Sequence, residues 1–283
     1  MAASRIFWLL VLLALAIMDW RVVTGQVDPR RIGQDHEYAF ELELEIRDAV
    51  GPFHLEICVP DHGEGLRLQD EQIAAGDLAI RMGETEGGRR LHVEGRRGDL
   101  PARVRYAARI GTRPVRYALD PDLRWDDLAS TTPGDSTGLV QTGHPEVVAA
   151  LRPILADAFG DTAATPTTPA GWQRRLRAAG LGPVPVVDQV FGFARDELRA
   201  ADFSGETDAV TALRLREASC GGKSRLMVAM LRTLGLEARV IGGLILGDAA
   251  RKRTSHVWVD VRLGDQWVPY DPLNDHRAEL PAS

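Results

Sequence analysis

Residues 216–243 read REASCGGKSRLMVAMLRTLGLEARVIGG, and this stretch decides the fold of the second half of the chain. Its middle part is strongly apolar, which predicts a buried helix that begins at Cys220. The helix is expected to end at Gly235, because glycine readily adopts the left-handed conformation of a helix end. The apolar run 238–246 follows and predicts a short strand. The stretch therefore predicts a helix and a strand in the core of a domain, with a cysteine in the first helical turn.

Cys220 is the first candidate for chemistry. Unpaired backbone N–H groups and the helix dipole favour a thiolate over a thiol at a helix N-terminus. Gly221 and Gly222 keep side chains away from the sulfur, so a substrate backbone could approach it closely. A cysteine at a helix start is by itself more often structural than catalytic, so its role depends on the residues that the rest of the domain brings to it.

Two strands of a hairpin come after this helix and strand. Residues 255–261 (SHVWVDV) alternate, Gly264-Asp265 is typical of a hairpin turn, and residues 266–272 (QWVPYDP) form the returning strand. A hairpin folded at this turn pairs position i with about position 529 − i, which puts Asp271 diagonally across from His256. Considered alone, His256 is more simply a hydrogen-bonded structural histidine at a strand start.

Together these residues form a candidate catalytic triad. A thiolate nucleophile, a histidine base and a carboxylate that orients the imidazole are provided by Cys220, His256 and Asp271. The oxyanion hole is expected to include the Cys220 backbone N–H. Its second donor stays open: Gln189 and Trp172 are candidates, but a helix surface and a hydrophobic core explain them more simply.

The order of these motifs resembles the core of the transglutaminase-like superfamily, whose fold is related to that of papain-like cysteine proteases. The matching features are Cys220 at a helix start, the run LRTLGLEARV, His256 in HVWV and Asp271 in WVPYDP. The resemblance is specific over about 205–275 and extends from about 140. It implies Cys220 as nucleophile, His256 as general base and then acid, and Asp271 as the orienting carboxylate. The implied chemistry is attack on an amide carbonyl, loss of an amine, and transfer of the thioester acyl group to water or another amine.

Two features bear on whether the triad is active. Ala218 stands two residues before the cysteine, where family members commonly have glycine. The segments CGGKSRL, GGLIL and SHVWV most resemble extracytoplasmic domains of bacterial membrane proteins, in which a transglutaminase-like domain is fused to several transmembrane helices; some of these domains are regarded as inactive. An active hydrolase or acyltransferase is the first expectation. The alternative is a catalytically inactive binding or scaffolding module at the membrane.

The region before the quoted stretch predicts helices and a domain boundary. Helical periodicity covers residues 145–155, 172–181 and 186–198. Turn and linker residues between 120 and 144 indicate the boundary, and residues 161–170 (DTAATPTTPA) predict a surface loop. The helices therefore belong to a domain over residues 140–283.

Residues 34–122 predict an antiparallel β-sandwich, because apolar and polar residues alternate in several short segments separated by turns. The strands are expected around Tyr38–Ile46, Phe53–Val59, Leu78–Met82, Leu91–Val93 and Val104–Ile110. One predicted strand carries glutamates on its polar face and another carries arginines. These charges either pair across the sheet or form two solvated faces, and the second is the simpler expectation. The residues are Glu41, Glu43 and Glu45, and Arg103, Arg105 and Arg109.

The first 26 residues are predicted to be a targeting segment. Arg5 precedes the apolar run 6–18, whose thirteen residues are too few to cross a hydrocarbon core of about 30 Å. Cleavage before Gln26 as a signal peptide and retention as an N-terminal membrane anchor are equally open. Both alternatives predict an extracytoplasmic protein, periplasmic or secreted. In the second, the anchor would hold the protein to the inner membrane.

Composition limits the function further. The chain has 283 residues and a formal net charge of −6, which argues against a nucleic-acid partner. Cys58, on a predicted sandwich strand, is expected to be a small structural residue. Residues 251–253 (RKR) are a solvated loop tip or, less simply, a clamp for a substrate carboxylate. No metal or cofactor is expected, because the histidines occur in unrelated segments without ligand spacing: His54, His92, His144 and His276.

We therefore predict an α+β protein in which an N-terminal antiparallel β-sandwich precedes a transglutaminase/papain-like core of helices packed on an antiparallel sheet. The expected function is cysteine-dependent acyl transfer or hydrolysis of peptide or cell-envelope amides. The expected partners are a peptide or protein substrate and a membrane protein.

Overall fold

The computed structural model describes residues 35–85, 88–128, 138–158, 165–201, 206–246 and 254–281. The described residues divide into two compact units, one from residue 35 to Val115 and one over Arg116–Leu280. The predicted targeting segment 1–26 and the basic cluster 251–253 lie outside the described residues. Among the helices that are described, none is long and apolar enough to span a membrane.

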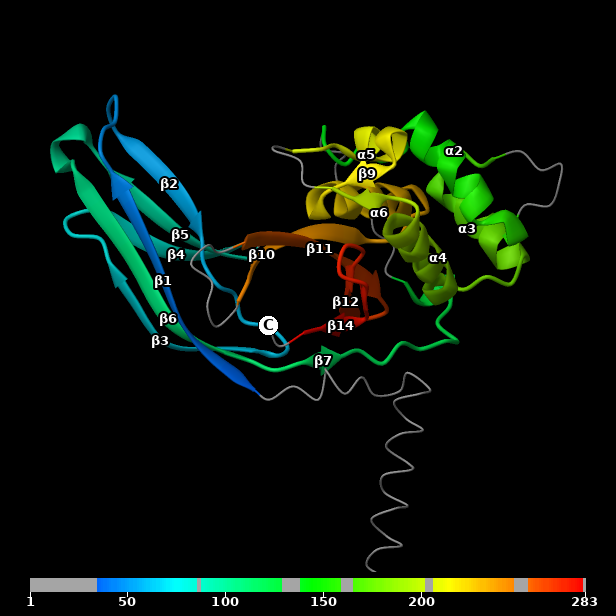
Figure 1. Ribbon diagram of the computed structural model, residues 1–283, viewed down its shortest axis with the longest axis horizontal. Coiled ribbons are helices and arrows are strands. Elements are labelled where there is room, and N and C mark those ends of the chain that lie inside the picture. The colour runs from blue at the N-terminus through cyan, green and yellow to red at the C-terminus, as the bar shows by residue number, and fades with distance from the viewer. Residues whose placement is uncertain are drawn as a thin grey trace, which may run out of the picture. The chain divides into compact units, whose positions relative to one another are not determined.

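The first unit consists of two three-stranded antiparallel sheets (Figure 1). One has the order β1-β6-β3 and the other the order β2-β5-β4. Apolar side chains of both sheets are buried, among them Tyr106 from one sheet and Val93 from the other. The strands are β1 (His36–Ile46), β2 (Phe53–Cys58), β3 (Leu66–Ala74), β4 (Ala79–Thr85), β5 (Gly88–Gly95) and β6 (Ala102–Thr112), and the 3₁₀ turn η2 (Arg97–Asp99) precedes β6.

A polar contact joins the two sheets inside this unit. The Arg89 guanidinium of β5 donates to both carboxylate oxygens of Glu71 in β3, at 2.9 and 3.2 Å, and the Tyr106 hydroxyl of β6 donates to the same carboxylate. Burial alone would raise the pKa of Glu71, but these hydrogen bonds and the Arg89 charge hold it below its ordinary value. Glu71 is therefore an ionised link between two layers of apolar side chains.

Two expectations for this unit need correction. The sequence did not predict β3, because its register against β6 shifts between Gln69 and Gln72 and the bulge breaks the two-residue alternation. The charged faces of β1 and β6 are also paired rather than separately solvated, through diagonal contacts across the two strands. These are Arg105–Glu41 at 2.6 Å, Arg103–Glu43 at 3.0 Å and Arg109–Glu37 at 3.5 Å.

The second unit packs helices against a four-stranded antiparallel sheet of order β10-β11-β12-β13 (Figure 1). Prolines stand in the first turn of three helices, at Pro145, Pro169 and Pro183, where a missing N–H costs no hydrogen bond. The helices are α2 (Pro145–Ile154), α3 (Pro169–Ala178), α4 (Pro183–Asp196), α5 (Ala209–Leu215) and α6 (Cys220–Thr233), with 3₁₀ turns η3 (Trp125–Asp127) and η4 (Ala156–Ala158). The strands are β10 (Ala238–Ile245), β11 (Thr254–Leu263), β12 (Gln266–Asp271) and β13 (His276–Arg277), and the two-residue strands are β7 (Val115–Arg116), β8 (Arg199–Ala200), β9 (Glu217–Ala218) and β14 (Glu279–Leu280).

Helix α6 is the central helix of this unit. Its packing partners are α2, α4 and α5 on one side and β10 and β11 on the other, and almost all of its residues are buried. Gly235, with φ +82°, follows its end as predicted. The apolar pattern of the sequence therefore identified the core helix correctly.

The predicted hairpin register is confirmed. Val259 pairs with Tyr270 and Leu263 with Gln266, so each pair of positions sums to 529. The predicted α+β class is likewise confirmed, with antiparallel sheets first and helices on a sheet second. Helix α5 was not predicted, because seven residues are too short to show helical periodicity clearly.

Candidate active site

Cys220 is the first residue of α6 and is partly exposed. Two local features define the start of this helix. The preceding residues Glu217–Ala218 form β9, which pairs in parallel with β8, and Ser219 takes an extended conformation as the N-cap. The Ser219 side chain makes no capping hydrogen bond, so it does not occupy the N–H groups of the first turn. The helix N-terminus is thus able to interact with a negative charge at the sulfur.

The two glycines after Cys220 have different roles. A Cβ on Gly221 would make only ordinary contacts, the nearest at 3.7 Å from Arg225. A Cβ on Gly222 would lie 2.9 Å from the Cβ of Ala218, which is too close. The expectation that Gly222 clears space around the sulfur is therefore incomplete, because Gly222 is buried and also makes room for Ala218.

His256 is buried near the start of β11, opposite Gly243 of β10. Its ring stacks on that of Trp258, two residues along the same strand face, with a centroid distance of 6.4 Å. A Cβ on Gly243 would lie 2.7 Å from the Trp258 ring. The absence of a side chain at Gly243 therefore leaves room for the Trp258 ring beside the His256 imidazole. In this position Trp258 limits the movement of the imidazole.

Asp271, the last residue of β12, holds His256 directly. The distance between His256 Nε2 and Asp271 Oδ2 is 2.6 Å. Burial alone would raise the pKa of Asp271, but the hydrogen bond from His256 and the donors of Asn274 lower it below its ordinary value. The carboxylate therefore stays ionised and accepts a hydrogen bond from the Nε2–H group of His256.

Asn274 is a site residue that the sequence reasoning missed. Its Nδ2 donates to Asp271 Oδ2 at 2.8 Å and lies 3.2 Å from His256 Nε2. The backbone N–H groups of Leu273 and Asn274 donate to the other carboxylate oxygen, at 3.0 and 3.2 Å. The only sequence signal was an asparagine in the turn directly after the predicted carboxylate. Its side chain fixes the plane of the carboxylate.

The bond to Asp271 decides which imidazole nitrogen is free for chemistry. Because Nε2 carries the proton donated to the carboxylate, Nδ1 keeps its lone pair on the other side of the ring. The Ser224 hydroxyl donates to the Val257 carbonyl at 3.2 Å and fixes α6 against β11 one residue beyond His256. Cys220 lies one helical turn before Ser224 and on the same helix face. The first turns of α6 and the start of β11 are thus joined in one rigid contact.

Lys223 is a second residue that the sequence reasoning missed. Its side chain is buried, and Nζ donates to the carbonyl oxygens of Arg195 at 2.8 Å and Pro272 at 3.4 Å. Burial lowers the pKa of Lys223, and the nearby charges of Asp196 and Asp271 oppose this shift. Lys223 therefore connects α6 both to the end of α4 and to the residue directly after Asp271.

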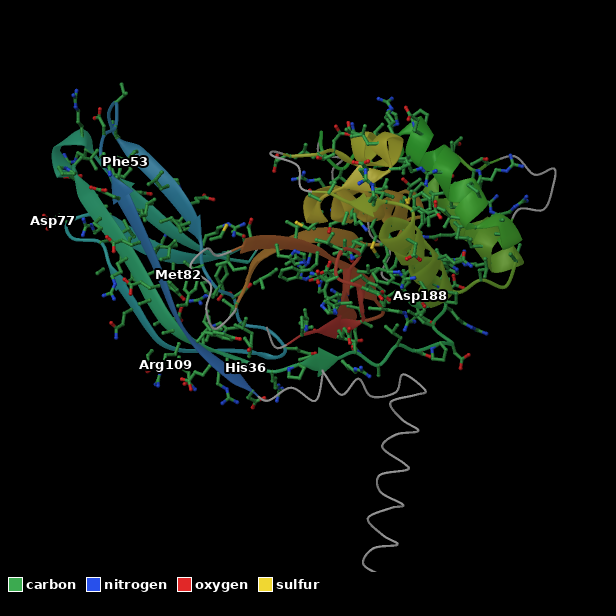
Figure 2. The ribbon with its side chains drawn as sticks, in the orientation of Figure 1. His36, Phe53, Asp77, Met82, Arg109 and Asp188 are labelled. Carbon is green, nitrogen blue, oxygen red and sulfur yellow. The ribbon has the colours of Figure 1, made fainter. Side chains whose placement is uncertain are left out.

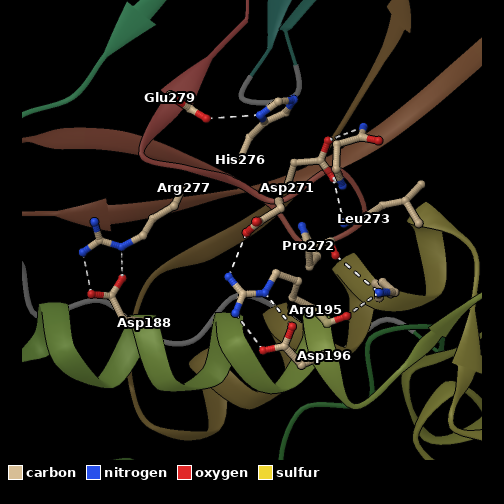
Figure 3. A network of polar contacts seen from close by, with 12 residues as sticks. Asp188, Arg195, Asp196, Asp271, Pro272, Leu273, His276, Arg277 and Glu279 are labelled. Carbon is tan, nitrogen blue, oxygen red and sulfur yellow. Dashed lines mark hydrogen bonds and ion pairs between the residues drawn. The ribbon is translucent and has the colours of Figure 1, made fainter. Parts of the chain in front are cut away.

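Helix α4 holds the segment after Asp271 through two further ion pairs (Figure 3). Arg195 contacts Asp275 at 2.8 Å, and Arg277 contacts both oxygens of Asp188, each at 2.6 Å. The end of the turn and β13 are thus fixed to α4. This arrangement supports the position of Asp271 from outside the strand.

Of the predicted site residues, His256 and Asp271 are brought into direct contact, and Cys220 lies at the start of the helix that packs on the same sheet. Trp172 is fully buried in α3, within the hydrophobic core, and Gln189 lies on α4. Both cysteines are free thiols, Cys58 exposed and Cys220 partly exposed. The second oxyanion donor stays unassigned.

Residues 171–272 match the family model described as the transglutaminase-like superfamily. This range includes all three residues of the predicted triad. No curated protein matches the sequence.

The solved structures that match this chain have low sequence identity to it. A candidate cysteine protease from Cytophaga hutchinsonii is 13% identical, with 87% of this chain and 84% of that chain covered and a TM-score of 0.49. The periplasmic domain of TgpA from Pseudomonas aeruginosa, bound to ethylmercury, is 17% identical, with coverages of 85% and 72% and a TM-score of 0.39. A candidate protease from Parabacteroides distasonis is 12% identical, with coverages of 84% and 64% and a TM-score of 0.29.

Proposed function

Because residues 171–272 match the model of the transglutaminase-like superfamily, we propose that this protein is a cysteine-dependent hydrolase or acyltransferase that acts on peptide or cell-envelope amides. The observation that carries the proposal is the buried hydrogen bond of 2.6 Å between His256 and Asp271, on the sheet against which the Cys220 helix packs. A structural histidine would need one partner. Here the carboxylate that orients the imidazole is itself held by three further donors.

The first half of the reaction forms a thioester. His256 Nδ1 takes the proton of the Cys220 thiol, and the sulfur attacks the amide carbonyl carbon. The negative oxygen of the tetrahedral intermediate accepts a hydrogen bond from the Cys220 backbone N–H. As the C–N bond breaks, the imidazolium gives its proton to the departing amine. Asp271 stabilises the imidazolium without taking its proton.

The second half releases the acyl group. A water molecule or a second amine takes the place of the departed amine, and His256 Nδ1 removes its proton as it attacks the thioester carbonyl. The sulfur leaves as a thiolate and recovers a proton from the imidazolium. Water gives a carboxylic acid and an amine gives a new amide, so the same residues serve hydrolysis and transfer.

The proposed location is extracytoplasmic, and the proposed protein partner is a membrane protein. The apolar run 6–18 behind Arg5 supports export, with cleavage or anchoring as the two forms. Fusions of a periplasm-dependent reporter after residue 35 test the location. An active reporter is expected, and a fusion that is produced but stays inactive would contradict the proposed location.

The reactivity of the two cysteines tests the enzyme, and Cys58 is an internal control because it is also a free thiol and is more exposed. In one sample at pH 6, iodoacetamide is expected to modify Cys220 at least about tenfold faster than Cys58, as followed by peptide mass spectrometry. His256→Ala should reduce the Cys220 rate to that of Cys58. Cys220→Ala should abolish acyl transfer to hydroxylamine from peptide amides.

Two outcomes would contradict the proposal, and the first of them favours an inactive binding module. If Cys220 reacts no faster than Cys58 in the folded protein, the nucleophile is not activated. If acyl transfer persists in Cys220→Ala, the activity belongs to another site or protein. Either result overturns the proposed function.

A further inference from the structure

A cluster of imidazole and carboxylate groups lies on the exposed face of the β2-β5-β4 sheet, in the first unit. Phe53, at the start of β2, and Met82, in β4, mark this sheet in Figure 2. The register of β2 and β5 sets Glu56 opposite His92 and His54 opposite Glu94, so these four side chains share one face. The expectation that His54 and His92 belong to unrelated segments is therefore wrong, because strand pairing brings them together.

Three possible ligand atoms of the cluster lie close to one another. His54 Nε2 is 3.5 Å from Glu56 Oε1 and 3.5 Å from His92 Nδ1, and His92 Nδ1 is 3.6 Å from Glu56 Oε1. These atoms form a nearly equilateral triangle. A tetrahedral ion with ligands at about 2.1 Å requires its ligand atoms to be about 3.4 Å apart. The triangle thus has the size of one face of a tetrahedral coordination sphere.

Neighbouring residues orient the two imidazoles for metal binding. Glu94 Oε1 lies 3.3 Å from His54 Nδ1, which is the contact that leaves Nε2 with a lone pair. Histidines that bind metals usually donate their second N–H to a carboxylate in this way. A Cβ on Gly83 would lie 2.8 Å from His92 Nε2, so the glycine leaves room for the His92 ring.

We propose that His54 Nε2, Glu56 Oε1 and His92 Nδ1 bind a divalent transition metal ion of the zinc type, with Glu94 orienting His54. Two imidazoles and one carboxylate suit zinc, copper or nickel better than magnesium or calcium, which prefer oxygen ligands. The fourth position would take water or a donor group of another molecule. The site belongs to the first unit, whereas the triad belongs to the second, so its occupancy is independent of the acyl-transfer proposal.

Metal titration of the full chain tests this site. The protein is made without a histidine tag and in a Cys220→Ala background, so that the thiol of the triad does not compete for the ion. Zinc is titrated against a chromophoric chelator, and cobalt is added separately to obtain the visible spectrum of a four-coordinate ion. We expect one zinc per chain and a tetrahedral cobalt spectrum.

Variants locate the ion. His54→Ala or His92→Ala should weaken zinc binding more than about 100-fold, and Glu94→Gln by about 10–100-fold through loss of orientation. His36→Ala is the matched control, a histidine of the same unit outside the cluster, and should leave the affinity unchanged. Circular dichroism of each variant verifies that the sheets are formed.

Two results would overturn the site. One is a dissociation constant for zinc weaker than about 100 μM in the parent protein. The other is unchanged affinity in the folded His54→Ala/His92→Ala double variant, which would place the ion elsewhere on the chain.

Discussion

At Asp271, four hydrogen bonds converge on one carboxylate, two from backbone N–H groups and two from side chains. Charge-assisted hydrogen bonds of this kind are stronger than those between neutral groups. Their combined effect exceeds the cost of burial, so the group stays charged where an isolated carboxyl would become neutral. The negative charge beside His256 is therefore a property of the turn after β12 as much as of the residue itself.

Replacing this carboxylate by an amide should reduce activity without removing the nucleophile. In Asp271→Asn the amide N–H₂ can face Nε2, which favours the imidazole tautomer with its proton on Nδ1 and removes the base. We expect kcat/KM to fall by about 10²–10⁴-fold. In a quenched time course with iodoacetamide at pH 6, the alkylation rate of Cys220 should fall toward that of Cys58. An unchanged rate would exclude Asp271 from the orienting role.

The same variant gives a pH dependence of stability with a defined sign. The pKa of Asp271 is lower in the folded protein than its ordinary value of about 3.9, so its contribution to the free energy of unfolding is complete above that value. The contribution is lost as the pH falls toward the folded pKa. Urea unfolding of the parent and Asp271→Asn should thus differ by a constant amount from about pH 7 to 5, and by less at about pH 3. A difference that grows on acidification contradicts the assignment.

At the scale of elements, the start of α6 depends on a contact between small residues. Gly222→Ala would set two Cβ atoms 2.9 Å apart, at Gly222 and Ala218, and this overpacking should cost about 1–3 kcal/mol of unfolding free energy. Gly221→Ala is the matched control for stability. It meets only ordinary contacts and should be neutral or gain up to about 1 kcal/mol from helix propensity.

A double variant separates this contact from other effects of the substitution. Ala218→Gly with Gly222→Ala moves the methyl group from β9 to α6 and should recover most of the lost stability in urea unfolding. Ala218 stands where the family that this chain resembles commonly has glycine. The glycine at position 222 provides the room that the Ala218 methyl group needs. No recovery in the double variant would show that another neighbour of Gly222 causes the loss.

Sequence patterns predicted the elements whose signals are local. The apolar run of α6, its glycine end and the Gly264-Asp265 turn were sufficient to predict a core helix and a hairpin with its register. They did not predict β3, in which a bulge breaks the alternation, or the roles of Lys223 and Asn274. Those roles depend on which carbonyl or carboxylate the fold brings to a side chain, and no local periodicity records this.

At the scale of the whole molecule, the two units differ in what stabilises them. The second has one large core around α6. The first has two three-stranded sheets that are joined in part by the Glu71–Arg89–Tyr106 contact. Glu71→Gln removes the charge of that link, and we expect a loss of about 1–2 kcal/mol from the first unit. Glu41→Gln, which alters an exposed pair with Arg105, is the control and should have little effect.

Two optical probes distinguish the units in this measurement. Within the described residues, the tryptophans lie in the second unit, at Trp125, Trp172, Trp258 and Trp267. Far-ultraviolet circular dichroism reports on both units, whereas tryptophan fluorescence reports mainly on the second. Glu71→Gln should shift the dichroism transition to lower temperature and leave the fluorescence transition in place. Equal shifts in both would contradict a local role.

The burial of α6 has a consequence for how an active site of this kind fails. Eleven of its 14 residues are buried, and its first turns are bonded to β11 through Ser224 and to the β12–β13 turn through Lys223. Backbone amides of α6 and β11 should therefore exchange with deuterium only through global opening of the second unit. Loss of catalytic competence and loss of this protection would then be one cooperative event, with the same midpoint and the same rate.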